Sequence, residues 1–385
     1  MNRLLFACSA ALALGLLSAP LGAQTRQKID VSRLGPQVGE KVPDFSLKDQ
    51  NGNTRTLQSI MGSKGAMIIF VRSADWCPYC KTQLVELQSQ LSQLKARGLG
   101  VASISYDSEA ILAAFSKQHG ITYPMLADAG SVTIKRFGIL NPLPELALSG
   151  GADDPELKAE VAKYVSVNGA RQQQVGMAFP GAFFVDRSGR VTARFFEDAY
   201  VERNTVSNLL VKLGAGPEVA ATKTSTAHLD VTAYVSDESV AAGNHFSVVL
   251  DIQPHAHLHV YAPGAEKNGY RVVAFRLDPH PQVLALAARY PASEIYDFKP
   301  LHERVPVFQK PFRLTQELVL DGSAASQQAL KGKDAITVTG ALQYQACDDK
   351  MCFNPVSVPL SWKVNLRAIL RDAPAPQRET SSVAR

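Results

Sequence analysis

Two regions of the chain differ in how hydrophobic and polar positions alternate. In the first region, the apolar run 66–71 predicts a buried strand, and the segment after it predicts a helix that ends at Gly98. The leucines on one face of this helix are Leu84, Leu87, Leu91 and Leu94. A second apolar run, 100–106, precedes a helix capped by Asp107 or Ser108. This alternation of strands and helices predicts two parallel strands covered by helices, which is the α/β fold class.

The rest of the first region predicts a hairpin and a closing helix. Residues 179–186 and 191–196 are apolar, and the turn residues 187–189 separate them, which is typical of a β-hairpin. A helix is expected from about 201 to 213. The stretch 140–176 is too long for a bare connection, so we expect an inserted helix over 155–167, with loops that shape a substrate groove. The alternative is a solvated surface excursion.

The second region has a hydrophobic period of two. It follows residues 214–227, which are small and polar and predict a flexible linker. Strands at short intervals with few helical patterns predict an antiparallel sandwich over 228–365. The expected strands lie near 229–233, 246–250, 271–275, 336–339 and 356–364. The Pro-, Ser- and Thr-rich tail, 366–385, is expected to be disordered.

Length and charge narrow the class of protein. A chain of 385 residues exceeds what one core usually covers, so two domains are expected. Its 46% hydrophobic and 19% charged residues are ordinary for a globular protein. A formal charge of +5 without a basic block gives no case for nucleic-acid binding.

The first 23 residues have the character of a secretory signal. Arg3 is a short basic region, 4–17 is apolar, and 21–23 is a plausible cleavage site before Gln24. Cleavage would remove Cys8 and leave a polar leader at 24–37; the alternative is an uncleaved N-terminal anchor. Export implies an oxidising compartment, in which close cysteine pairs can exist as disulfides.

The four remaining cysteines form two close pairs, Cys77/Cys80 and Cys347/Cys352. Trp76-Cys77-Pro78-Tyr79-Cys80 stands where a strand ends and a helix begins. The unpaired N–H groups of a helix start stabilise a thiolate, so we predict that Cys77 is the exposed thiol of low pKa. A low thiol pKa favours dithiol–disulfide exchange, with Cys77 attacking and Cys80 resolving the mixed disulfide.

Other interpretations of these residues stay open. The first cysteine pair could also be a structural disulfide or half of a zinc site, and the second could be a disulfide that only stabilises the fold. His255, His257 and His259 alternate, so on a strand they would share a face, as metal ligands can, but such histidines at a sheet edge are more often polar surface. With no fourth ligand identifiable, we predict neither a metal nor a cofactor.

The region 38–213 resembles the AhpC/TSA (redoxin) branch of the thioredoxin superfamily. The resemblance rests on residues 43–47, on 70–80, and on Pro180 followed by Phe183, Asp186 and Gly189. It implies a thioredoxin-like fold with a cis-proline beside the CxxC. Phe179-Pro180 matches that place, which implies that Phe179 and Pro180, with Trp76, Pro78 and Tyr79, contact the substrate. The alternative for Pro180 is an ordinary trans proline at a strand start.

The sequence departs from two patterns of this superfamily. Peroxidatic redoxins carry a Pro and a Thr or Ser ahead of the reactive Cys, but position −3 is Ala74 from Cys77 and Cys77 from Cys80. Peroxide reduction is therefore a weaker expectation, although Arg72 is placed to bind an anionic oxygen. Thioredoxins also carry a buried Asp six residues before the first Cys, where this chain has Val71, so water, Asp75 or another acid must handle the proton.

The second region resembles the N-terminal periplasmic domain of the thiol–disulfide interchange protein DsbD. The resemblance rests on 342–355, where Tyr-Gln-x-Cys precedes a second Cys, an aromatic and a proline, and on 259–261 with Gly264. It implies an immunoglobulin-like sandwich, a periplasmic location, a redox role for Cys347/Cys352 and a membrane electron donor of the DsbD kind. Four residues separate the two cysteines, one fewer than in DsbD.

Together these features predict an exported thiol–disulfide oxidoreductase acting on protein thiols or disulfides. The linker would let Cys77/Cys80 exchange electrons with Cys347/Cys352 within one molecule, at an effective concentration on the order of millimolar. The first alternative is a peroxiredoxin-like antioxidant peroxidase with the second domain as reductant. The second is an interaction protein whose sandwich disulfide is structural.

Overall fold

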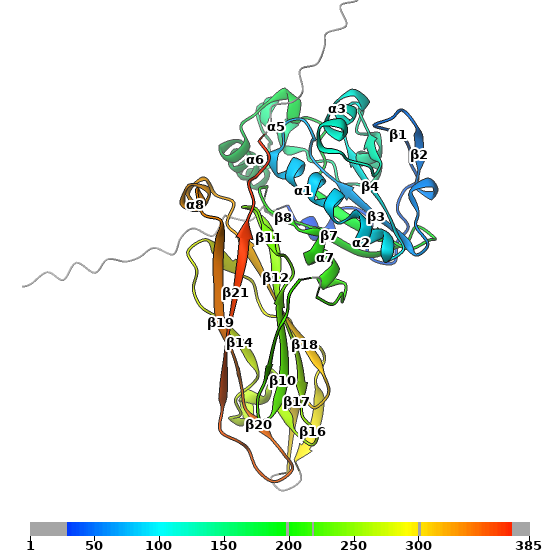
Figure 1. The fold of residues 1–385 in the computed structure, drawn as a ribbon. Coiled ribbons are helices and arrows are strands. Elements are labelled where there is room, and N and C mark those ends of the chain that lie inside the picture. The colour runs from blue at the N-terminus through cyan, green and yellow to red at the C-terminus, as the bar shows by residue number, and fades with distance from the viewer. Residues whose placement is uncertain (1–28, 198–199, 218, 299–301, 372–385) are drawn as a thin grey trace, which may run out of the picture.

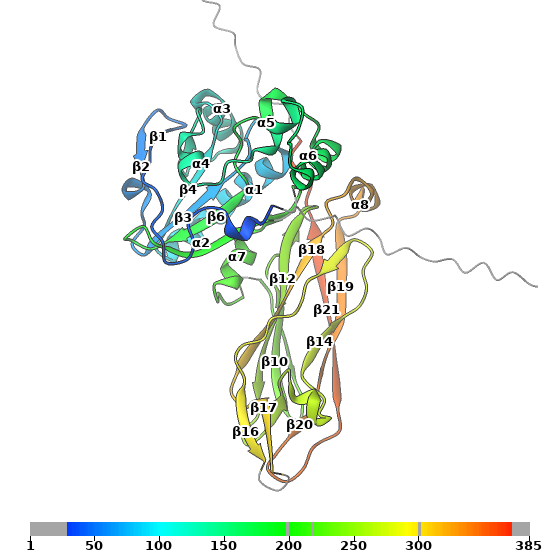
Figure 2. The same cartoon turned by 180° about the vertical axis from the view of Figure 1, so that it is seen from behind.

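A computed structural model describes residues 29–197, 200–217, 219–298 and 302–371. The predicted signal lies outside these residues. The described chain forms an α/β part, blue to green in Figure 1, and an elongated β part, green to red. Figure 2 shows the same arrangement from behind, with the α/β part seated on one end of the β part. No helix of the described residues is long and apolar enough to span a membrane.

The α/β part is built on a seven-stranded sheet with strand order β2-β1-β5-β4-β3-β6-β7. The apolar run predicted as a strand forms the fully buried β3, which pairs in parallel with β4 and antiparallel with β6. The predicted hairpin is confirmed as β6–β7. The strands are β1 (Ser46–Asp49), β2 (Thr54–Thr56), β3 (Gly65–Phe70), β4 (Leu99–Ser105), β5 (Met125–Ala127), β6 (Gly181–Val185) and β7 (Val191–Phe196).

Helices cover this sheet as the apolar spacing predicts. The four leucines of the first helical pattern are buried, although the helix is interrupted at Gln90 and becomes two. Ser108 caps the next helix by accepting a hydrogen bond from the Ile111 N–H, as expected for one of the two predicted caps. The helical elements are η1 (Val31–Arg33), η2 (Gln58–Ile60), α1 (Pro78–Ser89), α2 (Leu91–Ala96), α3 (Glu109–His119) and α4 (Val132–Arg136).

The inserted helix is confirmed, and the alternative of a solvated excursion is wrong. Its elements are α5 (Leu143–Leu148), α6 (Pro155–Asn168) and η3 (Gln172–Gln174). Leu143, Tyr164 and Met177 are fully buried and pack with Tyr200 in a core that Trp76 also contacts. The insertion is therefore part of the wall around the CxxC segment.

The closing helix begins later than predicted. The hydroxyl of Thr205 accepts from the Asn208 N–H, so α7 (Val206–Lys212) starts after Thr205. The preceding residues form the short strand β8 (Arg203–Asn204). Apolar periodicity alone did not separate this strand from the helix.

The sheets of the β part are antiparallel, as the period of two predicts, except for the parallel pairs β11–β21 and β8–β12. One sheet has the order β15-β18-β12-β10-β9 with β8 paired to β12; the others are β11-β21-β19-β14 and β16-β17-β13-β20. Its elements are β9 (Thr222–Ser225), β10 (Leu229–Val235), β11 (Ser239–Val240), β12 (Asn244–Pro254), β13 (His259–Tyr261), η4 (Ala265–Asn268), β14 (Ala274–Leu277), β15 (Val283–Ala285), β16 (Glu294–Phe298), β17 (Glu303–Phe308), β18 (Phe312–Leu320), α8 (Ala324–Leu330), β19 (Ala335–Tyr344), β20 (Ala346–Cys347) and β21 (Val356–Leu366).

We call residues 222–366 the β domain. Alternate side chains of its first two sheets share one hydrophobic core, which includes Phe246 on β12, Leu318 on β18 and Trp362 on β21. Each of these strands is long enough to extend along the whole β domain (Figure 1). Burial of alternate positions explains why the sequence pattern had a period of two.

Three segments outside the two predicted domains carry ordered contacts. The linker 214–227 includes β9, which pairs antiparallel with β10. The Arg194 guanidinium holds the leader by donating to backbone carbonyls of η1 and to Gln37 Oε1 at 2.9 Å. In the tail, the Leu370 N–H donates to Thr82 Oγ1 on α1 at 3.0 Å, while 372–385 lie outside the described residues. A small or polar composition did not distinguish a tethered segment from a free one.

Candidate functional site

The CxxC segment sits where β3 leads into α1. Cys77 is the N-cap of α1, and its sulfur accepts a hydrogen bond from the Cys80 N–H at 3.3 Å. Pro78 occupies the first helical turn, where its missing N–H costs nothing. Both cysteines are free thiols, and their sulfurs lie 2.6 Å apart. The two groups are therefore placed to form an intramolecular disulfide.

The prediction of an exposed Cys77 is wrong, because both cysteine side chains have 0% exposure. The Trp76 indole N–H donates to the Tyr106 hydroxyl at 2.8 Å, and the Tyr79 hydroxyl donates to the Gly322 carbonyl at 3.3 Å. Gly322 belongs to the β domain, so packing from another domain closes over the helix start. A substrate reaches the sulfurs only when these side chains move.

Two buried arginines approach the thiols. The Arg203 Nη2 donates to the Cys80 sulfur at 3.5 Å, and Arg203 has 2% exposure. Arg72 is also buried; its Nη2 donates to the Tyr200 carbonyl at 2.7 Å, and its guanidinium lies 5.8 Å from the Trp76 ring centre. Positive charge is thus concentrated around the dithiol.

These surroundings separate the acidities of the two thiols. Burial raises the pKa of Cys77 well above its usual value, and the hydrogen bond shared with Cys80 adds to this shift. Burial also raises the pKa of Cys80, but the hydrogen bond from the Cys77 thiol and the charges of Arg203 and Arg72 outweigh it, so this pKa falls well below its usual value. The lower thiol pKa therefore belongs to Cys80, and not to Cys77 as predicted.

Phe179 and Pro180 do not form the cis bond that the resemblance implied. No peptide bond of the described residues is cis. The Phe179 N–H donates to the Ile139 carbonyl at 2.8 Å, and Pro180 directly precedes β6. Pro180 is therefore the trans proline at a strand start, where its missing N–H leaves no ladder bond unmade.

The buried acid that contacts the loop ahead of Cys77 is Asp107. Its carboxylate accepts from the Ala74 N–H and the Ser73 hydroxyl, each at 2.7 Å, and from Ser105. Burial raises its pKa, which those hydrogen bonds partly oppose. Asp107 holds the loop ahead of Cys77, and the Ser73 hydroxyl is occupied by this bond.

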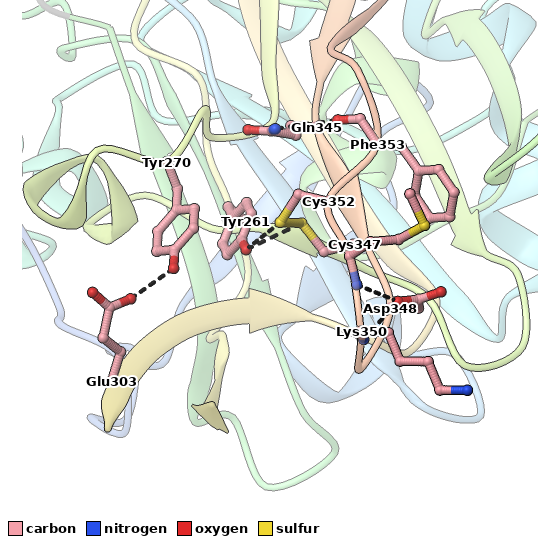
Figure 3. Close-up of a disulfide and its surroundings, with 10 residues drawn as sticks. Tyr261, Tyr270, Glu303, Gln345, Cys347, Asp348, Lys350, Cys352 and Phe353 are labelled. Carbon is pink, nitrogen blue, oxygen red and sulfur yellow. Dashed lines mark hydrogen bonds between the residues drawn. A yellow bond between two sulfur atoms is a disulfide. The ribbon is translucent and has the colours of Figure 1, made fainter. Parts of the chain in front are cut away.

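The second cysteine pair forms a disulfide at the tip of the β domain (Figure 3). Cys347 is 2% exposed, whereas Cys352 is exposed. The Tyr261 hydroxyl lies 3.1 Å from the Cys347 sulfur and 3.3 Å from the Cys352 sulfur. Because disulfide sulfurs carry no hydrogen, the phenol donates in both contacts. Burial raises the pKa of Tyr261, which keeps this donor protonated.

Aromatic rings fix Tyr261 in place. Its ring stacks on that of Tyr270 with centroids 4.1 Å apart, and the Tyr270 hydroxyl donates to Glu303 at 2.6 Å. Figure 3 shows these three side chains in a row leading to the disulfide. His259 and Tyr296 extend the aromatic cluster, with ring centroids 4.5 Å apart.

The structure does not bring the two cysteine pairs together. Strand β21 has 11 residues and so spans about 35 Å. Cys352 lies just before one end of β21, and Arg367, just after the other end, is paired with Glu86 on α1. Figure 1 shows β20 at the end of the molecule opposite α1. Direct intramolecular exchange between the pairs, as predicted, does not occur in this arrangement.

The three alternating histidines do not share a strand face. A turn at 256–257, with a positive φ of 65° at His257, separates His255 from β13, which begins at His259. His255 lies 3.3 Å from Asp230, whereas His259 is buried among aromatic rings. Within the described ranges, no group of three His, Cys, Asp or Glu is arranged to hold a metal ion.

Residues 38–194 match the family model described as the AhpC/TSA family. The match covers less than half of the chain, and we call residues 38–213, which carry it, the AhpC/TSA domain. Its sheet, with strand order β2-β1-β5-β4-β3-β6-β7, and the covering helices form a thioredoxin-like fold. The β domain lies outside the match.

Relatives of the AhpC/TSA domain carry two kinds of name. Peroxiredoxin Q of Populus jackii is 30% identical over 101 residues, 26% of this chain and 46% of that protein. Thiol-disulfide oxidoreductase ResA of Bacillus cereus is 27% identical over 165 residues, 42% of this chain and 91% of ResA. AhpC of Enterococcus faecalis, a solved structure, is 23% identical with a TM-score of 0.34, covering 46% of this chain and 91% of AhpC. The chain spans 46% to 66% of the length of the relatives with a peroxiredoxin name.

Sequence reasoning missed Arg203 and the role of Tyr261. Arg203 stands in a stretch that was assigned to a helix; Thr205, three residues before Asn208, was the available signal that the helix starts later. Tyr261 was noted only as part of a resemblance. No local pattern places either side chain against a sulfur, because each contact joins residues 86 or more positions apart.

Proposed function

We propose that this protein is a thiol–disulfide oxidoreductase whose Cys77/Cys80 pair cycles between dithiol and disulfide. The observation that carries the proposal is the pair of free sulfurs 2.6 Å apart at the start of α1, beside the Arg203 and Arg72 guanidiniums. A helix start and nearby positive charge both favour a thiolate, which is the species that attacks a disulfide.

The exchange transfers two electrons in two steps. The Cys80 thiolate attacks one sulfur of a substrate disulfide; a mixed disulfide forms, and the other substrate sulfur leaves as a thiolate that takes up a proton. Cys77 then loses its proton and attacks Cys80, which forms the Cys77–Cys80 bond and releases the second substrate sulfur as a thiol. The substrate is reduced and the CxxC is oxidised. Arg203 and Arg72 stabilise the anionic sulfur before the first step.

A peroxidase is the second candidate, and a specific observation favours it. The site is enclosed, and its more acidic thiol is Cys80. A peroxide is small enough for such a site. However, the residue three positions before Cys80 is Cys77, so the hydroxyl that polarises peroxide is replaced by a thiol. We therefore rank disulfide exchange first.

Stopped-flow mixing separates the two candidates. Trp76 beside the dithiol reports oxidation by fluorescence, and a Trp362→Phe background removes the other tryptophan of the chain. We expect reduced protein to react with a small aromatic disulfide more than about tenfold faster than with the same concentration of hydrogen peroxide, because disulfide exchange requires no polarising hydroxyl. A faster reaction with peroxide would reverse the ranking.

We further propose that the β domain acts like the N-terminal domain of DsbD, in the periplasm. The support is a Tyr261-bonded disulfide with one exposed sulfur, together with the signal-like residues 1–23. Its partner would be the dithiol of another protein, with a membrane-bound donor of the DsbD kind as the candidate. An incoming thiolate attacks the exposed Cys352 sulfur and Cys347 leaves, its negative charge stabilised by the hydrogen bond from Tyr261.

Changing Tyr261→Phe tests this role of the tip. We expect reduction of the Cys347–Cys352 disulfide by dithiothreitol to slow roughly tenfold to a hundredfold, because a hydrogen bond to a charged group contributes about 1.5–3 kcal/mol. The rate is measured by alkylation and mass spectrometry at timed intervals. Tyr270→Phe is the matched control, since Tyr270 donates to Glu303. Equal rates for both variants would show that Tyr261 only packs, as a structural disulfide would allow.

A further inference from the structure

The strand that carries Arg203 belongs to the sheet of the β domain. Strand β8 is two residues long and pairs in parallel with β12, which aligns Arg203 with Asn244 and Asn204 with His245. The Arg203 N–H donates to the Gly243 carbonyl at 2.8 Å. The backbone of the AhpC/TSA domain at Arg203 is therefore held by the other domain.

This contact requires glycine. Gly243 has a φ of +87°, and a Cβ there would lie 2.2 Å from the Val201 carbonyl oxygen, a distance that no real side chain tolerates. Gly322 packs against the same place, since its Cβ would lie 2.9 Å from Val201 Cγ2 and 3.2 Å from the Gly243 Cα. The two loops of the β domain thus set where β8 lies.

The Arg203 guanidinium is buried without a carboxylate partner. Its acceptors are the backbone carbonyls of Tyr200 and Glu202 and the sulfur of Cys80, and its Nε is buried without a hydrogen-bond partner. Within the described residues it forms no salt bridge, in contrast to Arg367 or Arg313. A buried cation needs an anion, and the Cys80 sulfur is the acceptor here that can become one.

We propose that the β domain completes the redox site of the AhpC/TSA domain, because Gly243 and β12 position the Arg203 guanidinium against the Cys80 sulfur. This inference rests on the proposed function of Cys77/Cys80 as the redox pair. The charged and titratable groups that face the Cys80 sulfur are Cys77, Arg203 and Arg72.

A pH titration of the thiolate absorbance near 240 nm tests the proposal without any substrate. It is carried out on the full chain with the Cys347–Cys352 disulfide intact. We expect Arg203→Met to move the first thiolate titration upward by about one pH unit or more, because a neighbouring positive charge is lost. Arg203→Lys should restore part of the shift. Both variants are checked for folding by circular dichroism.

Gly243→Ala tests the positioning from the β domain. This substitution should also move the first thiolate titration to higher pH, since the added Cβ displaces Val201 and with it β8. Gly214→Ala is the matched control: Gly214 also has a φ of +87°, but nothing lies within 4 Å of its Cβ, so the titration should stay unchanged. If Arg203→Met does not fold, Gly243→Ala and the neutral variant Arg203→Gln test the proposal instead.

Two outcomes overturn the inference. An unshifted thiolate titration in folded Arg203→Met, or in the neutral Arg203→Gln when the former does not fold, would show that Arg203 only packs. An unshifted thiolate in Gly243→Ala would show that the β domain does not position Arg203. A wild-type protein with an acidic thiolate but no turnover would instead refute the proposed function and leave the role of Arg203 standing.

Discussion

Replacing Cys80 with serine is expected to abolish turnover and also to prevent the first attack. The Cys77 thiol left behind is fully buried, and its pKa is raised by that burial, so it forms little thiolate near neutral pH. We expect the rate of reaction with a disulfide to fall on the order of a thousandfold or more, as is typical when a nucleophile is removed. Stopped-flow kinetics and intact mass after mixing provide the measurement.

Cys77→Ser is the matched variant, and it should behave differently. The serine hydroxyl can still donate to the Cys80 sulfur, and the guanidinium of Arg203 remains beside it. Cys80 should therefore attack once and stop as a stable mixed disulfide, which intact mass shows as one adduct per chain. A stable adduct on Cys80→Ser, with none on Cys77→Ser, would mean that Cys77 attacks first, as the sequence alone suggested.

Changing Glu317→Ala should cause the largest loss of stability at the domain contact. Glu317 Oε1 accepts from Lys212 Nζ at 2.6 Å and from the His245 ring at 2.8 Å, and all three side chains are nearly buried. Without this carboxylate two cations lose their shared partner, which we expect to cost about 3–5 kcal/mol in the free energy of unfolding. Denaturant unfolding measures it. Glu294→Ala, whose pair with the exposed Lys310 contributes about 0–1 kcal/mol, is the control.

The pH dependence identifies the cause of this loss. Burial lowers the pKa of His245, but its hydrogen bonds to Glu202 and Glu317 raise it to about 9, above the ~6.5 of an unfolded chain. The stabilisation is therefore full below about pH 6.5 and disappears as the pH rises through about 9. The unfolding free energies of wild type and His245→Gln should converge over that interval. A difference that persists above pH 9 would rule out the charge of His245 as the cause.

Local patterns of the sequence predicted the elements that form the AhpC/TSA domain. The apolar run 66–71, the four leucines of the next helix and the cap at Ser108 depend on neighbours within one or two turns, so the sequence displays them directly. The cysteine positions follow from the same reasoning, because Cys77 and Cys80 begin a recognisable helix. Alternation with a period of two likewise revealed the long strands of the β domain.

The surroundings of the sulfurs were not predictable in this way. Which thiol is acidic depends on Arg203, 123 positions from Cys80, and on a glycine loop of the other domain. The separation of the two cysteine pairs follows from the length and direction of β21, which composition does not report. The segment 214–227 was taken for a free linker because its residues are small, yet part of it completes a sheet edge. Each error concerns tertiary contact, which overrides local preference.

The placement of the two sulfur pairs at opposite ends of the β domain has a consequence for stoichiometry. Partners that reach Cys352 and partners that reach the AhpC/TSA domain meet surfaces about 35 Å apart along β21. Two such partners would not compete sterically, so one molecule could bind both at the same time. This chain would then connect its two partners in a ternary complex with one partner at each end, rather than by binding them in turn.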